Sequence, residues 1–123
     1  MEQESAAMQV QRFAQVDILV AVHGAGLTNV IFMIPQSYLI ELMPPSWDLA
    51  CYRRLAENAD IGYRILREAN TRPVNCKKGS NFQKCRQREI RDRDFNVTVS
   101  KVLENVERGI LYVRKNKYVG KRV

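Results

Sequence analysis

Apolar residues along the chain form three short runs separated by stretches with helical spacing. Branched and other apolar side chains predominate in residues 17–22, 38–43 and 61–66. The first run, "DILVAV", has no alternation of polar and apolar positions, which is typical of a strand covered on both faces of a sheet. The pattern therefore predicts two buried strands, the second of them "YLIELM" followed by two prolines, and a third strand at 61–66.

Helical spacing marks the segments between and after these strands. We predict helices near residues 8–14, 27–33 and 47–58, with Pro35 ending the second of them. The clearest pattern predicts an amphipathic helix over 97–114, where apolar residues recur every three or four positions. They are Val99, Val102, Leu103, Val106, Ile110 and Val113. The polar, cationic stretch 68–93 is predicted to be a long basic loop.

Alternating strands and helices are the pattern of a parallel α/β sheet with flanking helices. The 123 residues suffice for a single modest domain. Three strands make a thin sheet compared with the roughly six of a doubly wound domain. We therefore expect residues 1–123 to be the C-terminal half of a larger Rossmann-like domain, with Met1 an artificial start.

Composition is that of a soluble globular protein, with 46% hydrophobic and 27% charged residues. No segment has the pattern of a signal peptide or a membrane span, so any signal or anchor is expected outside this chain. The net charge of +7 suits an anionic partner such as nucleic acid, an acidic membrane or a phosphorylated small molecule. Nucleic acid is disfavoured because the basic region 77–93 contains only one aromatic residue, Phe82.

The cysteines and one sequon bear on the cellular compartment. Cys76 and Cys85 bracket a polar loop that a disulfide could close, whereas Cys51 lies in a helical pattern and is expected to be a small buried hydrophobe. No CxxC spacing indicates a metal site, and none is predicted. Asn96 begins an N-glycosylation sequon. A closable cysteine loop and a sequon together favour an oxidising lumen.

The candidate chemistry lies at "HGAG", His23 to Gly26, between the first strand and the following helix. Ligands of parallel sheets bind beyond the carboxyl ends of the strands. Glycines allow positive φ and close approach of an anion, and the first helical amides favour a phosphate. His23 can add a hydrogen bond or an ion pair, and Thr28 a hydroxyl. The alternative is purely structural, with a tight glycine turn and a buried imidazole.

Three chemistries fit such a turn. A dinucleotide site would use Glu41 at the end of the next strand to bind ribose, but Asn29 stands where the third glycine belongs. "HGAG" resembles the HGGG-type turn that forms the oxyanion hole of esterases. An esterase also needs a G-x-S-x-G motif and a second histidine, and the chain has neither. The third is a nucleotide-sugar site, in which the turn holds a diphosphate.

The segments "DILVAVHGAGLTNVIFM" and "YLIELMPPSWDLACYRRLAENADIGYRIL" resemble the C-terminal part of family 61 glycosyltransferases, across residues 3–66. The resemblance implies a two-domain enzyme of the GT-B type, with this chain as the latter part of the donor-binding domain. The diphosphate of a UDP-sugar would then be bound without a metal or a tightly bound cofactor. The residues implied to line it are His23, Gly24, Ala25, Gly26, Leu27 and Thr28.

The same resemblance implies transfer of N-acetylglucosamine or xylose to a glycoprotein or glycan in the ER or Golgi lumen. The catalytic base is expected in the missing N-terminal part of the enzyme, so the isolated chain should be inactive. Glu41 either approaches the ribose or is a buried acid bonded to backbone amides near Pro44 and Pro45. Trp47 and Tyr52 are expected mainly to pack, with a minor share in the nucleotide pocket as the alternative. Asp17 is expected to anchor a neighbouring loop rather than to catalyse. The alternatives are a non-catalytic nucleotide-binding or interaction module and, third, a dinucleotide-binding domain.

Overall fold

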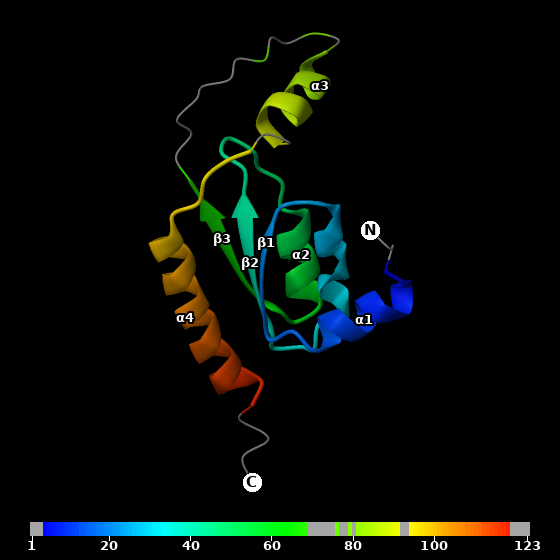
Figure 1. Cartoon of the computed structure of the whole chain (residues 1–123), viewed down its shortest axis with the longest axis vertical. Coiled ribbons are helices and arrows are strands. Elements are labelled where there is room, and N and C mark those ends of the chain that lie inside the picture. Colours follow the sequence, from blue (N-terminus) through cyan, green and yellow to red (C-terminus); the bar gives the residue numbers. More distant parts are fainter. Residues whose placement is uncertain (1–3, 69–75, 77–78, 80, 92–93, 119–123) are drawn as a thin grey trace.

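The structure, a computed structural model, describes residues 4–68, 76, 79, 81–91 and 94–118. Helices and strands alternate along the chain (Figure 1). The elements are α1 (Ala6–Ala14), β1 (Ile18–Val22), η1 (Ala25–Phe32), β2 (Tyr38–Met43), α2 (Cys51–Asn58), β3 (Gly62–Arg67), α3 (Phe82–Arg86), η2 (Gln87–Arg91) and α4 (Val99–Asn116).

The strands form one parallel sheet in the order β1-β2-β3. Tyr38, at the start of β2, aligns with Ile18 on one side and with Gly62 on the other. All six residues of the central strand β2 are buried, as its unbroken apolar run predicts. The predicted α/β fold with a parallel sheet and flanking helices is thereby confirmed.

Alternate residues of β2 face two different cores. Leu39 packs with Leu27, Val30 and Ala56 of η1 and α2. Ile40, one residue on, packs on the other face with Val113 of α4. Figure 1 accordingly shows α4 on one side of the sheet and α1 and α2 on the other. The sheet is therefore the middle layer of three.

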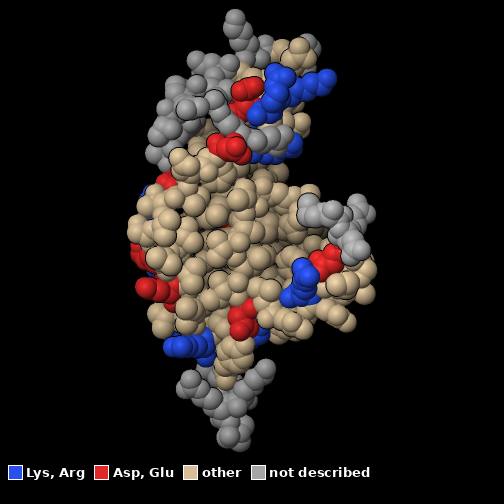
Figure 2. Space-filling model, in the orientation of Figure 1, with Lys and Arg blue, Asp and Glu red and all other residues tan. Residues whose placement is uncertain are grey.

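Strand β1 departs from the prediction of a strand covered on both faces. Val20 and Val22 are 37% and 52% exposed. Both share the face of Ile18, which contacts the α4 core. Among the described strands, none pairs with the outer side of β1. The face of the molecule seen in Figure 2 has almost no charged side chains at its centre. The prediction was wrong because β1 is an edge strand that α4 covers only at its beginning.

Three helical segments also differ from the sequence pattern. η1 is a 3-10 helix that begins at Ala25, before the second glycine, and this tighter geometry suits a short connector. α2 begins only at Cys51. Residues 82–91, predicted to be loop, are helical, and Cys85 within them forms a disulfide with Cys76. Local spacing could not reveal this helix because tertiary contacts hold it in place.

The C-terminal end of α4 is fastened to the amino end of the sheet. Lys117 Nζ lies 2.6 Å from Asp17 Oδ1 and 2.8 Å from Ser37 Oγ. The hydroxyl of Tyr118 lies 2.8 Å from each carboxylate oxygen of Asp17. Asp17 thus anchors the chain at the end of α4. No helix in the described part of the chain is long and apolar enough to cross a membrane.

Candidate functional site

The "HGAG" turn follows the carboxyl end of β1, where the sequence places it. The amide of His23 donates to the carbonyl of Leu42 at 2.9 Å, so the parallel ladder between β1 and β2 continues to His23. The chain then leaves the sheet through Gly24 into η1. The sheet therefore fixes where His23 stands, and the glycines lie just beyond its edge.

The glycines do not adopt the backbone conformation expected for them. Gly24 has φ 172° and ψ 167°, which is extended backbone, and no described glycine has positive φ. A Cβ added to Gly26 would meet nothing within 4 Å, and one added to Gly24 would meet only the carbonyl oxygen of Val22 at 3.9 Å. The fold therefore does not need glycine here. What the glycines provide is open space next to the backbone.

The amides of the turn differ in whether they are already bonded. Leu27 donates to the carbonyl of Gly24 at 3.0 Å, and its side chain is only 3% exposed. Leu27 thus belongs to the core. Within the described part of the chain, the amides of Gly24, Ala25 and Gly26 donate no backbone hydrogen bond. Ala25, Gly26 and Thr28 are exposed, so the turn presents free donors to solvent.

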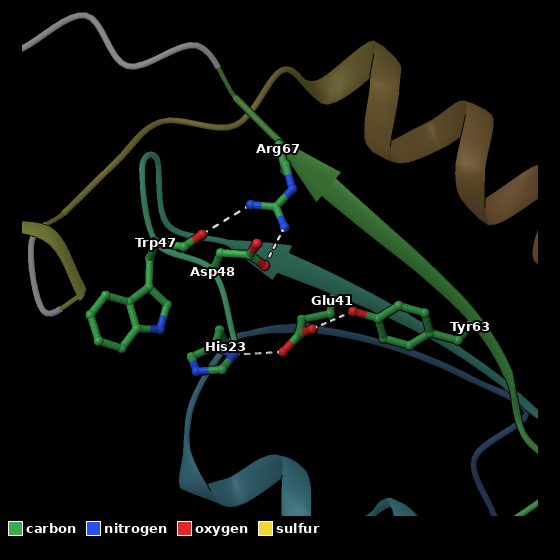
Figure 3. A network of polar contacts seen from close by, with 6 residues as sticks. All are labelled: His23, Glu41, Trp47, Asp48, Tyr63 and Arg67. Atoms are coloured by element: carbon green, nitrogen blue, oxygen red, sulfur yellow. Dashed lines mark hydrogen bonds and ion pairs between the residues drawn. The ribbon is translucent and has the colours of Figure 1, made fainter. Parts of the chain in front are cut away.

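His23 belongs to a buried network that crosses all three strands (Figure 3). Its Nδ1 lies 2.7 Å from Oε2 of Glu41, and the hydroxyl of Tyr63 donates to Oε1 of Glu41 at 2.5 Å. The side chains of His23 and Glu41 are 4% and 0% exposed. The three residues come from the same face of the sheet, because Ala21 aligns with Glu41 and Leu39 with Tyr63.

The network determines which nitrogen of His23 is available. Burial, and then the hydrogen bond to Glu41, raise the pKa of Tyr63 well above its usual range, although Arg53 and Arg67 oppose the shift. Tyr63 therefore keeps its proton at neutral pH and donates it to Glu41. Since the other carboxylate oxygen accepts from the Nδ1–H of His23, the second ring nitrogen, Nε2, is left to contact other groups. Figure 3 shows that nitrogen on the side away from Glu41.

Glu41 is therefore a buried acid, but not one bonded to backbone amides. Both of its oxygens are occupied by side chains, and neither is exposed. This arrangement favours the structural interpretation over contact with ribose. Tyr63 was not singled out from the sequence, although strand alternation places it on the face of Glu41 and could have identified it.

Tyr52 of α2 completes the surroundings of His23. The two rings meet edge to face with centroids 5.0 Å apart. Burial is the largest cause that raises the pKa of Tyr52, followed by the nearby Cys51 and Glu41, while a hydrogen bond with Thr28 lowers it. Tyr52 thus packs, as expected, and also connects α2 with the turn. Cys51 is a free, half-buried cysteine.

Trp47 lies in the loop that follows β2 and is only 8% exposed. Arg67 holds this loop by donating to the carbonyl of Trp47 at 2.9 Å and to Asp48 at 2.8 Å. The indole Nε1 is buried and has no hydrogen-bond partner among the described residues. Leaving such a donor unsatisfied costs about 1–3 kcal/mol. Packing alone therefore leaves the indole N–H of Trp47 without an acceptor among the described residues.

Two arginines of the helical segment 82–91 lie over the Trp47 ring. The guanidinium carbons of Arg86 and Arg91 are 5.1 and 6.0 Å from its centroid. Arg86 also lies 5.8 Å from the ring of Phe82. Part of the basic stretch is thus helical and lies against the loop that follows β2 instead of being a solvated loop.

The remaining predicted sites lie apart from this network. Asn96 is exposed, and Thr98 of its sequon donates from its amide and its hydroxyl to Glu68, at 2.6 and 3.1 Å. No group of three or more His, Cys, Asp or Glu able to hold a metal ion occurs in the described ranges.

Residues 1–40 match the sequence model of the family Glycosyltransferase 61. No curated protein and no solved structure gave a significant match. The matched segment contains the turn 23–28 but ends one residue before Glu41. The resemblance to this family is therefore confirmed for residues 1–40. The resemblance that residues 41–66 show to the same family stays a prediction.

Proposed function

From the membership of residues 1–40 in glycosyltransferase family 61, we propose that this chain is the donor-binding part of an enzyme that transfers a sugar from a UDP-sugar to a glycoprotein or glycan. The sugar is of the N-acetylglucosamine or xylose type. The turn 23–28 holds the diphosphate of the donor. The observation that carries the proposal is that the amides of Gly24, Ala25 and Gly26 donate no backbone hydrogen bond to a described residue, next to open space at both glycines.

The chemistry of transfer explains why such a turn is useful. As the bond to the sugar breaks, negative charge accumulates on the departing diphosphate, and preorganised donors stabilise it. The backbone amides of the turn do this together with His23, whose Nδ1 is held by Glu41. In this proposal the amides, His23 and basic residues take the place of a metal ion. A base from another part of the enzyme deprotonates the acceptor hydroxyl.

The exposed edge of β1 supports a larger GT-B donor domain. Parallel sheets are normally covered on both faces, yet Val20 and Val22 are exposed. We place a further strand and its covering helix, from the N-terminal part of the enzyme, against this edge. Such a strand would pair with the outer backbone groups of β1, with which no described strand pairs.

The proposed compartment is the lumen of the ER or Golgi, with any membrane anchor outside this chain. The Cys76–Cys85 disulfide suits an oxidising environment. The exposed Asn96 can carry an N-glycan there. Both features agree with an enzyme that acts on glycoproteins.

The test uses the single histidine of the chain as a reporter. UDP, GDP and NAD⁺ are titrated in turn while the imidazole signals of His23 are followed by NMR, and the full-length enzyme is assayed for transfer. We expect UDP to shift these signals at lower concentration than GDP or NAD⁺. Binding of UDP without transfer by the full-length protein would favour a non-catalytic nucleotide-binding module. Preference for NAD⁺ would favour the dinucleotide site, which the occupied oxygens of Glu41 do not support.

A further inference from the structure

The indole N–H of Trp47 is a buried donor without an acceptor among the described residues. An indole nitrogen only donates, and buried donors are normally bonded to an acceptor. Trp47 is 8% exposed, and no described residue accepts from its Nε1. An acceptor for this N–H would have to come from outside the described part of the chain.

Arg86 supplies a positive charge beside the same ring. Its guanidinium lies over Trp47 and Phe82, and no described residue forms an ion pair or a hydrogen bond with it. Stacking on aromatic faces leaves the N–H groups at the edge of a guanidinium free to bind an oxyanion in pairs. Arg86 is half-buried, so an anion bound there would be partly shielded from water.

The segment that carries Arg86 lies where a ligand of the sheet would bind. Figure 1 shows α3 beyond the carboxyl ends of β2 and β3. Cys85, the neighbour of Arg86, is tied to Cys76 by the disulfide. In the view of Figure 3, the indole of Trp47 lies on the side of His23 that faces away from Glu41. Trp47 and Arg86 therefore belong to the end of the molecule that carries the turn 23–28.

We propose that Trp47 and Arg86 form a second anion-binding element of the donor site, which takes phosphate oxygens of the nucleotide diphosphate. This inference rests on the proposed function. Arg86 stays stacked on the ring and binds the phosphate through the N–H groups at the edge of its guanidinium, and the N–H of Trp47 donates to an oxygen that enters beside it. The basic segment 82–91 thus contributes charge that the turn lacks, and the disulfide holds that charge in place.

The single tryptophan of the chain makes this element directly observable. Inorganic pyrophosphate and UDP are titrated while the fluorescence of Trp47 is recorded for the wild type, Arg86→Gln and Arg88→Gln. Arg88 is the matched control, because its side chain is 80% exposed and pairs with Glu89 on the same segment. We expect both ligands to change the emission. Arg86→Gln should weaken binding about tenfold or more, and Arg88→Gln by less than about twofold.

Trp47→Phe tests the indole N–H itself, since phenylalanine keeps an aromatic ring under Arg86 but has no donor. Binding of UDP to this variant is measured by calorimetry, and its fold is checked by circular dichroism. We expect an approximately fivefold loss of affinity. If Trp47→Phe fails to fold, the comparison of Arg86→Gln with Arg88→Gln still decides.

The outcomes separate this inference from the proposed function. If UDP binds the wild type and Arg86→Gln equally well, but not Gly26→Leu, the second element is refuted and the turn stands. If Arg86→Gln weakens the binding of pyrophosphate but Gly26→Leu leaves its affinity unchanged, the second element stands and the role of the turn is refuted. If neither ligand binds the wild type, both are refuted.

Discussion

The two ends of the sheet carry polar networks of opposite character. At the amino end, Lys117 donates to Asp17 and Ser37, and Tyr118 to Asp17. At the carboxyl end, Glu41 joins His23 and Tyr63. Beside that second network, however, the amides of Gly24, Ala25 and Gly26 and the indole N–H of Trp47 have no acceptor in the described part of the chain.

The difference distinguishes a structural network from a binding site. Buried polar groups normally satisfy one another, and the amino end does so while it fastens α4 to the sheet. The carboxyl end instead combines unpaired donors with arginines stacked on an aromatic ring. Substitutions at the amino end should therefore affect stability alone, and those at the carboxyl end should also affect ligand binding.

The largest effect on stability is expected from Glu41→Ala. The change leaves Nδ1 of His23 and the hydroxyl of Tyr63 without their acceptor in a site that is 0% exposed at Glu41. We expect the free energy of unfolding to fall by about 3–5 kcal/mol in urea denaturation. Glu57→Ala, at an exposed position of α2, is the control and should change it by less than about 0.5 kcal/mol. Equal effects would show that the network is not buried as described.

Gly26→Leu should produce the largest effect on binding. A Cβ at Gly26 meets nothing within 4 Å, so the fold should tolerate leucine while the added side chain occupies the space of the phosphate. We expect at least about a hundredfold loss of UDP affinity in calorimetry, equivalent to about 2.7 kcal/mol, with an unchanged thermal midpoint. A variant that binds UDP as the wild type does would place the diphosphate elsewhere.

Sequence reasoning reached the sheet and the turn because both depend on local patterns. The unbroken apolar run of β2 and the "HGAG" corner can be read from neighbouring residues. The partners of Glu41 could not be read in this way, since Tyr63 is 22 residues distant in the sequence. The helix 82–91 was missed because its contacts with Trp47 and Cys76 are also distant. The exposure of Val20 depends on the position of β1 at the sheet edge.

Lys117→Met should affect stability but not binding. The side chain of Lys117 is 8% exposed and that of Asp17 is 43% exposed, so the ion pair is partly screened by water. We expect a loss of about 1–2 kcal/mol in the free energy of unfolding and unchanged UDP affinity. Lys115→Met, at an exposed position of the same helix, serves as the control. A loss of UDP affinity in Lys117→Met would remove the distinction between the two ends.

The smallest effect is a change in pH dependence in Tyr63→Phe. Because folding raises the pKa of Tyr63, its contribution to stability is complete below the unfolded value of about 10 and is lost as pH rises towards the folded value. Stability of the wild type, measured by urea denaturation between about pH 8 and 11, should therefore fall more steeply than that of Tyr63→Phe. Parallel curves would mean that Tyr63 does not donate to Glu41.

The most direct test of the account follows the backbone amides at both ends of the sheet by ¹⁵N NMR while UDP is added. We predict that the signals of Gly24, Ala25 and Gly26 move markedly and saturate together, whereas those of Asp17 and Ser37 at the amino end stay in place. Unmoved turn signals at a UDP concentration that saturates the protein would contradict the central claim that these amides hold the diphosphate.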